Sequence, residues 1–188
     1  MRRKSYDVLF EPKQGMAFLM KAPTLWRSLF YFIISAGAFM GVVTNVWLAE
    51  HSLSTRFAVL AGLLITQIVF LVVYSCFLHG LLDACGVPGG DIEGLLCIMG
   101  YTALPYLVLT PVALLGVKLG GIWLGLILLA FLVGGIWWVF LLVRALQVVY
   151  LIDFLRAAAT VCLSLLLLAV IMVMPIYLLV KMLLLQWC

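Results

Sequence analysis

The sequence predicts an all-α, polytopic integral membrane protein, a helical bundle of five transmembrane helices with the third helix kinked at a proline. Hydrophobic residues make up 68% and charged residues 10% of the 188 residues, against about 45–50% and about 25% in a soluble domain. The apolar residues form five runs, each long enough to supply the roughly 20 residues that cross a hydrocarbon core about 30 Å thick. The runs do not alternate in polarity, as the strands of an outer-membrane barrel would.

The five predicted spans comprise residues 25–49, 57–82, 92–117, 121–143 and 157–180, with an extension of the fourth span to Tyr150 as the alternative. Residues 1–24 precede them as a basic, amphipathic segment that lacks the short apolar core of a cleavable signal peptide, so we expect the first span to be retained. No soluble stretch is long enough for a further domain. Residues 1–188 are therefore expected to form a single membrane domain.

The segment before the first span admits two interpretations. Between Pro12 and Pro23 the sequence PKQGMAFLMKAP mixes apolar side chains with Lys13 and Lys21. It is typical of a short helix that lies flat at the membrane surface. A basic tail that only determines topology would have the same composition, so both interpretations stay open.

Two glycine pairs predict close helix packing in the first and fourth spans. Gly37 and Gly41 form the sequence GAFMG, and Gly121 and Gly125 form GIWLG. Small residues four positions apart let helix backbones approach each other in a bilayer. The partner is expected to be another helix of the same chain, with a second copy as the alternative.

The third span contains residues that disfavour helix, in the sequence GYTALPYLVLTP from Gly100 to Pro111. Pro105 cannot donate a backbone hydrogen bond, so the carbonyl of Tyr101 is expected to lose its helical partner. We predict a kink near Gly100, Tyr101 and Thr102, with threonine hydroxyls or adjacent helices as substitute donors.

Pro111 and Pro175 are expected to release the carbonyls of Leu107 and Ile171 in the same way. Such breaks either shape the bundle or line a substrate path, as in many transporters. Cysteine labelling at Thr102 or Tyr106 would succeed only in the second case.

The distribution of Lys and Arg predicts the orientation of the chain. Basic residues are concentrated in residues 1–27 and 144–156, whereas the other side holds only Arg56, Lys118 and Lys181. The N-terminus is therefore expected in the cytoplasm and the C-terminus on the opposite side. The net charge of +4 indicates contact with anionic lipid headgroups and not with nucleic acid.

The remaining charged residues near the spans are expected at their cytoplasmic ends, where they would form a cytoplasmic face: Asp83, Asp91, Glu93, Arg144, Asp153 and Arg156. Charges inside spans usually mark ion pathways, so this placement disfavours an ion-coupled transporter. The acidic loop DACGVPGGDIEG either docks against the basic N-terminal segment or supplies negative charge to the first turn of the third helix. Both roles stay open.

No set of residues predicts catalysis, a cofactor or a metal site, and we expect the protein not to be an enzyme. The sequence lacks HExxH, GxSxG and a glycine-rich phosphate loop. His79 and Asp83 share a helix face, either as a proton relay or metal contact or as a simple polar pair. The five cysteines contain no CxxC pair: Cys76, Cys85, Cys97, Cys162 and Cys188.

Three segments carry a family resemblance: VLFEPKQGMAFL, VPGGDIEGLLCIMGYTALPYLVL and IWWVFLLVRALQVVY. Together they resemble the Yip family of Ypt/Rab-interacting membrane proteins, in particular its short bacterial branch. The resemblance implies five spans, a cytoplasmic N-terminus and no catalytic site. Eukaryotic relatives are associated with Rab-type GTPases and generally carry an Asp-Leu-Tyr-Gly-Pro motif, which this chain lacks. GTPase binding is therefore not expected, and a bacterial cytoplasmic (inner) membrane is the expected location.

These observations lead to two hypotheses about function. The first is a non-enzymatic adaptor, organiser or lipid-associated component of the membrane, whose partners are membrane lipids and a protein partner or a second copy of the chain. The alternative is a small carrier, channel or lipid-moving protein with a path beside the broken third helix.

Overall fold

Five helical segments of the computed structural model are long and apolar enough to cross a membrane. The structure describes residues 7–21, 23–87, 89–118 and 123–186. The spans are α3 (Leu25–Trp47), α4 (Leu53–Ala84), a composite third span, α7 (Trp123–Tyr150) and α8 (Phe154–Gln186). The third span consists of α5 (Ile92–Met99), a 3-10 turn η1 (Gly100–Ala103) and α6 (Leu104–Lys118). The prediction of an all-helical, five-span bundle is confirmed.

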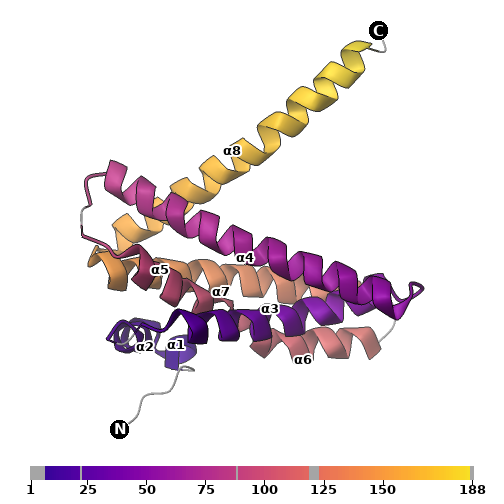
Figure 1. Cartoon of the computed structure of the whole chain (residues 1–188), viewed down its shortest axis with the longest axis horizontal. Coiled ribbons are helices and arrows are strands. Elements are labelled where there is room, and N and C mark those ends of the chain that lie inside the picture. The colour runs from indigo at the N-terminus through magenta and orange to yellow at the C-terminus, as the bar shows by residue number, and fades with distance from the viewer. Residues whose placement is uncertain (1–6, 22, 88, 119–122, 187–188) are drawn as a thin grey trace.

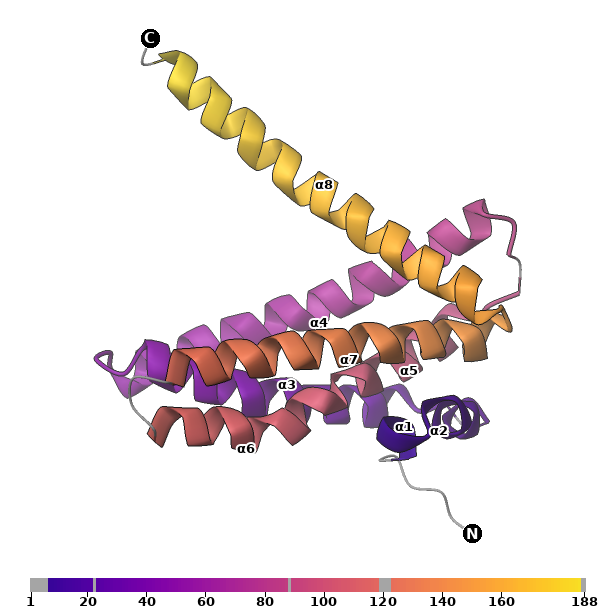
Figure 2. The ribbon, with the colours of Figure 1, turned by 180° about the vertical axis from the view of Figure 1, so that it is seen from behind.

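Helices α3, α4, α6 and α7 run side by side along the long axis of the molecule (Figure 1). Helix α8 begins at the end where α7 finishes and then diverges from the bundle, which both views show (Figure 2). Two short helices, α1 (Asp7–Phe10) and α2 (Pro12–Leu19), lie at that same end of the bundle. The connections that follow α4 and α7 are also at this end, so one end of the bundle collects the N-terminal segment and two inter-span loops.

The N-terminal segment is helical, as the first of the two interpretations predicted. Pro12 occupies the first turn of α2, where the missing backbone N–H has no helical acceptor to serve. Met16 is fully buried in the main hydrophobic core together with Val8 of α1. The segment is thus packed against the bundle, mainly along α7.

Helices α4, α7 and α8 extend beyond the predicted spans 57–82, 121–143 and 157–180. Helix α4 begins at Leu53 because Ser52 caps it, with the side-chain oxygen accepting a hydrogen bond from the N–H of Thr55 at 3.2 Å. Helix α7 continues through Arg144 to Tyr150, which is the longer of the two predicted ends of this span. The guanidinium of Arg144 lies over the Phe140 ring at 5.1 Å. This cation–π contact stabilises the charged side chain within the helix.

The third span changes helix type at Gly100, where a methyl group would overlap the Ser28 hydroxyl of α3 and lie 2.8 Å from the Ser28 carbonyl oxygen. Only a residue without a side chain permits this approach of η1 to α3. Pro105 follows as the second residue of α6, where a proline does not interrupt helical hydrogen bonding. The change of helix type thus lies just before Pro105, while a bend at the proline itself stays a prediction.

The carbonyl of Tyr101 is satisfied differently from the prediction. It accepts the N–H of Leu104 within the 3-10 turn, so it does not require a threonine. The hydroxyl of Thr102 donates instead to the carbonyl of Met99 at 2.6 Å. In α6 the hydroxyl of Thr110 donates to Tyr106, not to Leu107. The threonines therefore supply donors near both breaks, but to other carbonyls than those predicted.

Replacing Gly100 with alanine should destabilise the protein by about 1–3 kcal/mol, because the new methyl group meets the Ser28 backbone, which cannot rotate away. The melting temperature in detergent measures this effect. Gly62→Ala in α4 is the matched control, since a methyl group there meets nothing within 4 Å. Equal melting temperatures for the two variants would contradict the close contact between η1 and α3.

Candidate functional site

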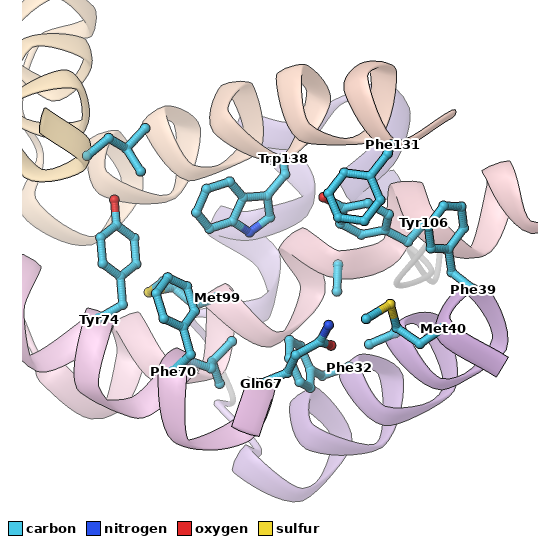
Figure 3. Close-up of a pocket in the computed structure, with 14 residues that line it drawn as sticks. Phe32, Phe39, Met40, Gln67, Phe70, Tyr74, Met99, Tyr106, Phe131 and Trp138 are labelled. Atoms are coloured by element: carbon cyan, nitrogen blue, oxygen red, sulfur yellow. The ribbon is translucent and has the colours of Figure 1, made fainter. Parts of the chain in front are cut away.

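The bundle encloses a cavity of about 250 Å³ to which all five spans contribute. Seven aromatic side chains and one amide dominate its wall (Figure 3). The lining residues are Phe32, Ala36, Phe39, Met40, Gln67, Phe70, Leu71, Tyr74, Met99, Ala103, Tyr106, Phe131, Trp138 and Leu165. The volume approaches the lower limit of typical small-molecule pockets, about 300 Å³.

One side of the cavity is formed by three rings from three different helices. Phe39 of α3 lies 5.3 Å from Tyr106 of α6 and 5.9 Å from Phe131 of α7, measured between ring centroids. Aromatic pairs at these separations stabilise each other beyond their burial. Half of the Phe131 surface is exposed, so this side of the cavity borders the membrane.

The opposite side is fixed by a buried hydrogen bond between α4 and α8. The hydroxyls of Tyr74 and Ser164 are 2.8 Å apart, and Ser164 also donates to its own helix. Phe70 stacks on Tyr74 with the rings 8° from parallel, while 41% of the Phe70 surface is exposed. The cavity therefore has a rigid interior and aromatic residues at its membrane-facing edges.

The broken segment of the third span borders the cavity with one face only. Met99, Ala103 and Tyr106 line it, whereas Thr102 is fully buried and does not. Gly100, Tyr101 and Pro105 are buried as well, away from the lining. The predicted position of a path, beside the broken helix, thus coincides with a real cavity, although four of the residues proposed for it do not line it.

The other two prolines lie elsewhere. Pro111 stands inside α6 on an exposed surface. Pro175 lies within α8, but its side chain is outside the described part of the structure. Pro111 does not contribute to the cavity wall.

The predicted glycine pairs make looser contacts than expected. Methyl groups on Gly37 and Gly41 would meet the side chains of Leu64 and Leu60 of α4 at 3.8 and 4.0 Å, which is ordinary packing within the chain. A methyl group on Gly125 would meet nothing within 4 Å. Gly121 lies outside the described residues.

The closest contacts occur at glycines that the spacing did not reveal. A methyl group on Gly134 of α7 would lie 2.8 Å from the Tyr106 ring, and one on Gly90 would overlap the Tyr150 ring. Gly134 has no glycine four positions away, and Gly90, although four positions from Gly86 and Gly94, lies outside a helix, so helical spacing carried no signal for either contact. Gly134 helps to position Tyr106 in the cavity wall.

The predicted His79 and Asp83 pair is confirmed, with the ring Nε2 3.6 Å from the carboxylate. The other ring nitrogen, Nδ1, hydrogen-bonds the hydroxyl of Tyr150 at the end of α7. This third member was missed because it lies on another helix. The cluster connects the ends of α4 and α7, where Gly90 in the following loop packs on the Tyr150 ring.

Both roles considered for the acidic loop are observed. The carboxylate of Asp91 caps α5 by accepting the N–H groups of Glu93 and Gly94, each at 3.1 Å. Gly94 also packs against the N-terminal segment, since a methyl group there would lie 2.6 Å from Met20 Cε. The loop and the N-terminal segment therefore touch at this end of the bundle, with Glu93 exposed beside them.

The basic residues of the predicted cytoplasmic face are not paired with its acids. Arg144 donates to Gln147 at 2.8 Å and stacks over Phe154. Asp153 and Arg156 are exposed at the start of α8. Among the described residues, no three His, Cys, Asp or Glu side chains converge as a metal site would require.

Sequence reasoning placed a path beside the third span but missed the walls that the other four spans contribute, although one signal for them was present. Gln67, Phe70 and Tyr74 are spaced by three and four residues, which places an amide and two rings on one face of a membrane helix. A polar side chain in the middle of a span is unusual and marks such a face as functional. The other walls come from helices whose depth and rotation only the tertiary structure determines.

Comparison with known families supports this architecture. Neither the curated proteins nor the solved structures give a match to the chain. The family model of the Yip1 domain matches residues 6–175, which is most of the chain and includes all five spans, at least in part. The match confirms the resemblance found in the sequence, and the chain belongs to the Yip1 domain family of multi-pass membrane proteins.

Proposed function

We propose that this chain is a non-enzymatic, lipid-associated membrane component whose central cavity holds part of a membrane lipid. The single observation that supports the proposal is the aromatic cavity itself, which is lined by side chains from all five spans. Its exposed edges, Phe70 and Phe131, would admit an apolar chain directly from the bilayer. Burial of apolar surface in such a cavity is favourable through close packing.

The membrane is proposed to be a bacterial cytoplasmic membrane, with the end that carries α1, α2 and the α4–α5 loop in the cytoplasm. The basic residues of the N-terminal segment support this orientation. Cys85 lies exposed in that loop as a free thiol. A membrane-impermeant thiol reagent added to intact cells should therefore not label Cys85. Strong labelling would show that this end of the bundle faces the outside and would contradict the proposed orientation.

The same end is proposed to act as an organising surface for a protein partner or a second copy of the chain. Exposed Phe10 of α1, Glu93 of α5 and Arg156 of α8 lie there together with the N-terminal helices. Crosslinking in native membranes should trap a discrete product. A purely monomeric product would remove this part of the proposal.

A second candidate, a lipid-moving protein, is favoured by the position of the cavity against the 3-10 turn. Met99 and Ala103 belong to the segment where the third span changes helix type, and broken helices at mid-membrane often form substrate sites. Reconstituted liposomes should then exchange labelled phospholipid between leaflets faster than protein-free liposomes. Equal exchange rates would remove this candidate while leaving a static lipid site intact.

Filling the cavity should displace the lipid. Ala103→Phe places a ring in the cavity from η1, and Ala36→Leu fills it from α3. We expect native mass spectrometry to show at least a tenfold loss of retained lipid in both variants. Ala58→Phe on the exposed surface of α4 is the control and should retain lipid like the wild type. Unchanged retention in folded Ala36→Leu and Ala103→Phe proteins would refute the cavity as the lipid site.

Neighbouring glycines of α7 provide a finer test. Gly134→Ala pushes the Tyr106 ring towards the cavity and should cost about 1–3 kcal/mol of stability together with a partial loss of retained lipid. Gly135→Ala meets nothing within 4 Å and should leave both quantities unchanged. The melting temperature and the lipid content are measured on the same preparations. If the two variants behave alike, Tyr106 does not depend on Gly134 for its position.

A further inference from the structure

Three hydrogen-bond donors of the cavity wall have no acceptor within the described part of the chain. They are the amide of Gln67, the indole N–H of Trp138 and the hydroxyl of Tyr106. Figure 3 shows the Gln67 amide pointing into the space between the labelled side chains, with the indole nitrogen of Trp138 bordering the same space. By contrast, the Tyr74 hydroxyl is satisfied by Ser164. A polar group without a partner is costly in a membrane interior, so these donors indicate a ligand that carries acceptors.

The depth of Gln67 limits the kind of ligand. Gln67 stands fourteen residues after the first residue of α4 and seventeen before the last, about 21 and 26 Å along the helix. It is therefore near the middle of the bilayer, roughly 15 Å from either edge of the hydrocarbon core. The ester oxygens of a phospholipid remain near those edges, and only its acyl chain reaches this depth. An acyl chain has no acceptor for the three donors.

The wall also determines the shape of the ligand. Its seven aromatic side chains present ring faces and edges from α3, α4, α6 and α7, and such surfaces favour a flat conjugated ring. None of the described residues that line the cavity is charged, and an ionised group would be costly at this depth. The ligand is therefore uncharged, flat, and equipped with oxygen acceptors.

We propose that the cavity binds a lipid-soluble quinone-type ring, whose carbonyl oxygens accept hydrogen bonds from Gln67, Trp138 and Tyr106. The proposal rests on the proposed function, because it specifies which lipid the cavity holds. The ring lies among the aromatic side chains, and its apolar tail leaves between the exposed edges at Phe70 and Phe131 towards the bilayer. The interaction is binding alone and includes no electron transfer.

Trp138 makes the binding directly measurable. The full chain, reconstituted in lipid nanodiscs of synthetic phospholipid, is titrated with a benzoquinone that carries a ten-carbon alkyl tail, since quinones quench nearby indole fluorescence. We expect a saturable decrease in fluorescence. Trp138→Phe should lose most of the saturable part, whereas the adjacent Trp137→Phe, which is not in the cavity wall, should keep it. Non-saturable quenching, or equal quenching in both variants, would overturn the proposal.

The amide provides an independent test that does not depend on Trp138. Gln67→Leu keeps the size of the side chain but removes its donors, and should weaken quinone binding about five- to tenfold. The control is Thr66→Val, the next residue of α4, whose hydroxyl bonds its own helix at Gly62. Unchanged affinity in Gln67→Leu would overturn the role of the amide. If Trp138→Phe does not fold, this pair decides the question.

The failure of this inference can be distinguished from the failure of the proposed function. Ala103→Phe is examined in the same nanodiscs for both quinone quenching and retained phospholipid. If Ala103→Phe loses retained phospholipid but the wild-type protein shows no saturable quenching by the quinone, the proposed function stands and the quinone class is refuted. Loss of saturable quenching in Ala103→Phe, with Ala58→Phe unaffected, supports both. No effect of Ala103→Phe on either ligand refutes both.

Discussion

The requirement that every backbone polar group finds a partner inside the bilayer governs how this bundle is built. The third span meets it by changing to a 3-10 turn at Gly100–Ala103, where the Tyr101 carbonyl takes a donor from Leu104 instead of from the proline that follows. The turn brings Gly100 against the Ser28 backbone and makes this span the most buried of the five. Because η1 lies deep in the bundle, its other face, with Ala103, is available to form a cavity wall.

Composition and run length were enough to predict the five spans and the helical class, because the hydrocarbon core imposes one length and one polarity on every span. The ends of the spans were less predictable. Arg144 was counted with the loop after the fourth span, while an end at Tyr150 stayed open, and α7 does continue past Arg144, whose guanidinium stacks over Phe140. The number and class of the spans were thus predictable because the bilayer determines them. The span ends were less predictable because contacts between particular side chains determine them.

The candidate site shows the same division. His79 and Asp83 were recognised as a pair because both lie on one helix, whereas Tyr150 joins them from α7 across a sequence separation of 71 residues. Spacing by four identified Gly37 and Gly41, but the tight approaches occur at Gly100 and Gly134, where a partner from another helix fills the space. The cavity depends on how far the five spans are shifted along the bundle axis relative to one another. A single sequence does not reveal these shifts.

The lengths of α4 and α8 have a consequence for the membrane in which this protein resides. Their 32 and 33 residues correspond to about 48 and 50 Å of helix, well beyond a hydrocarbon core about 30 Å thick. Such helices must tilt or project beyond the lipid, and the balance between the two changes with bilayer thickness. Since α8 diverges from its neighbours (Figure 2) while Tyr74 and Ser164 hold its base to α4, a thicker or thinner membrane would alter the angle between these two helices. Bilayer thickness is therefore a physical variable to which the two longest helices are exposed, and α4 and α8 both contribute to the wall of the cavity.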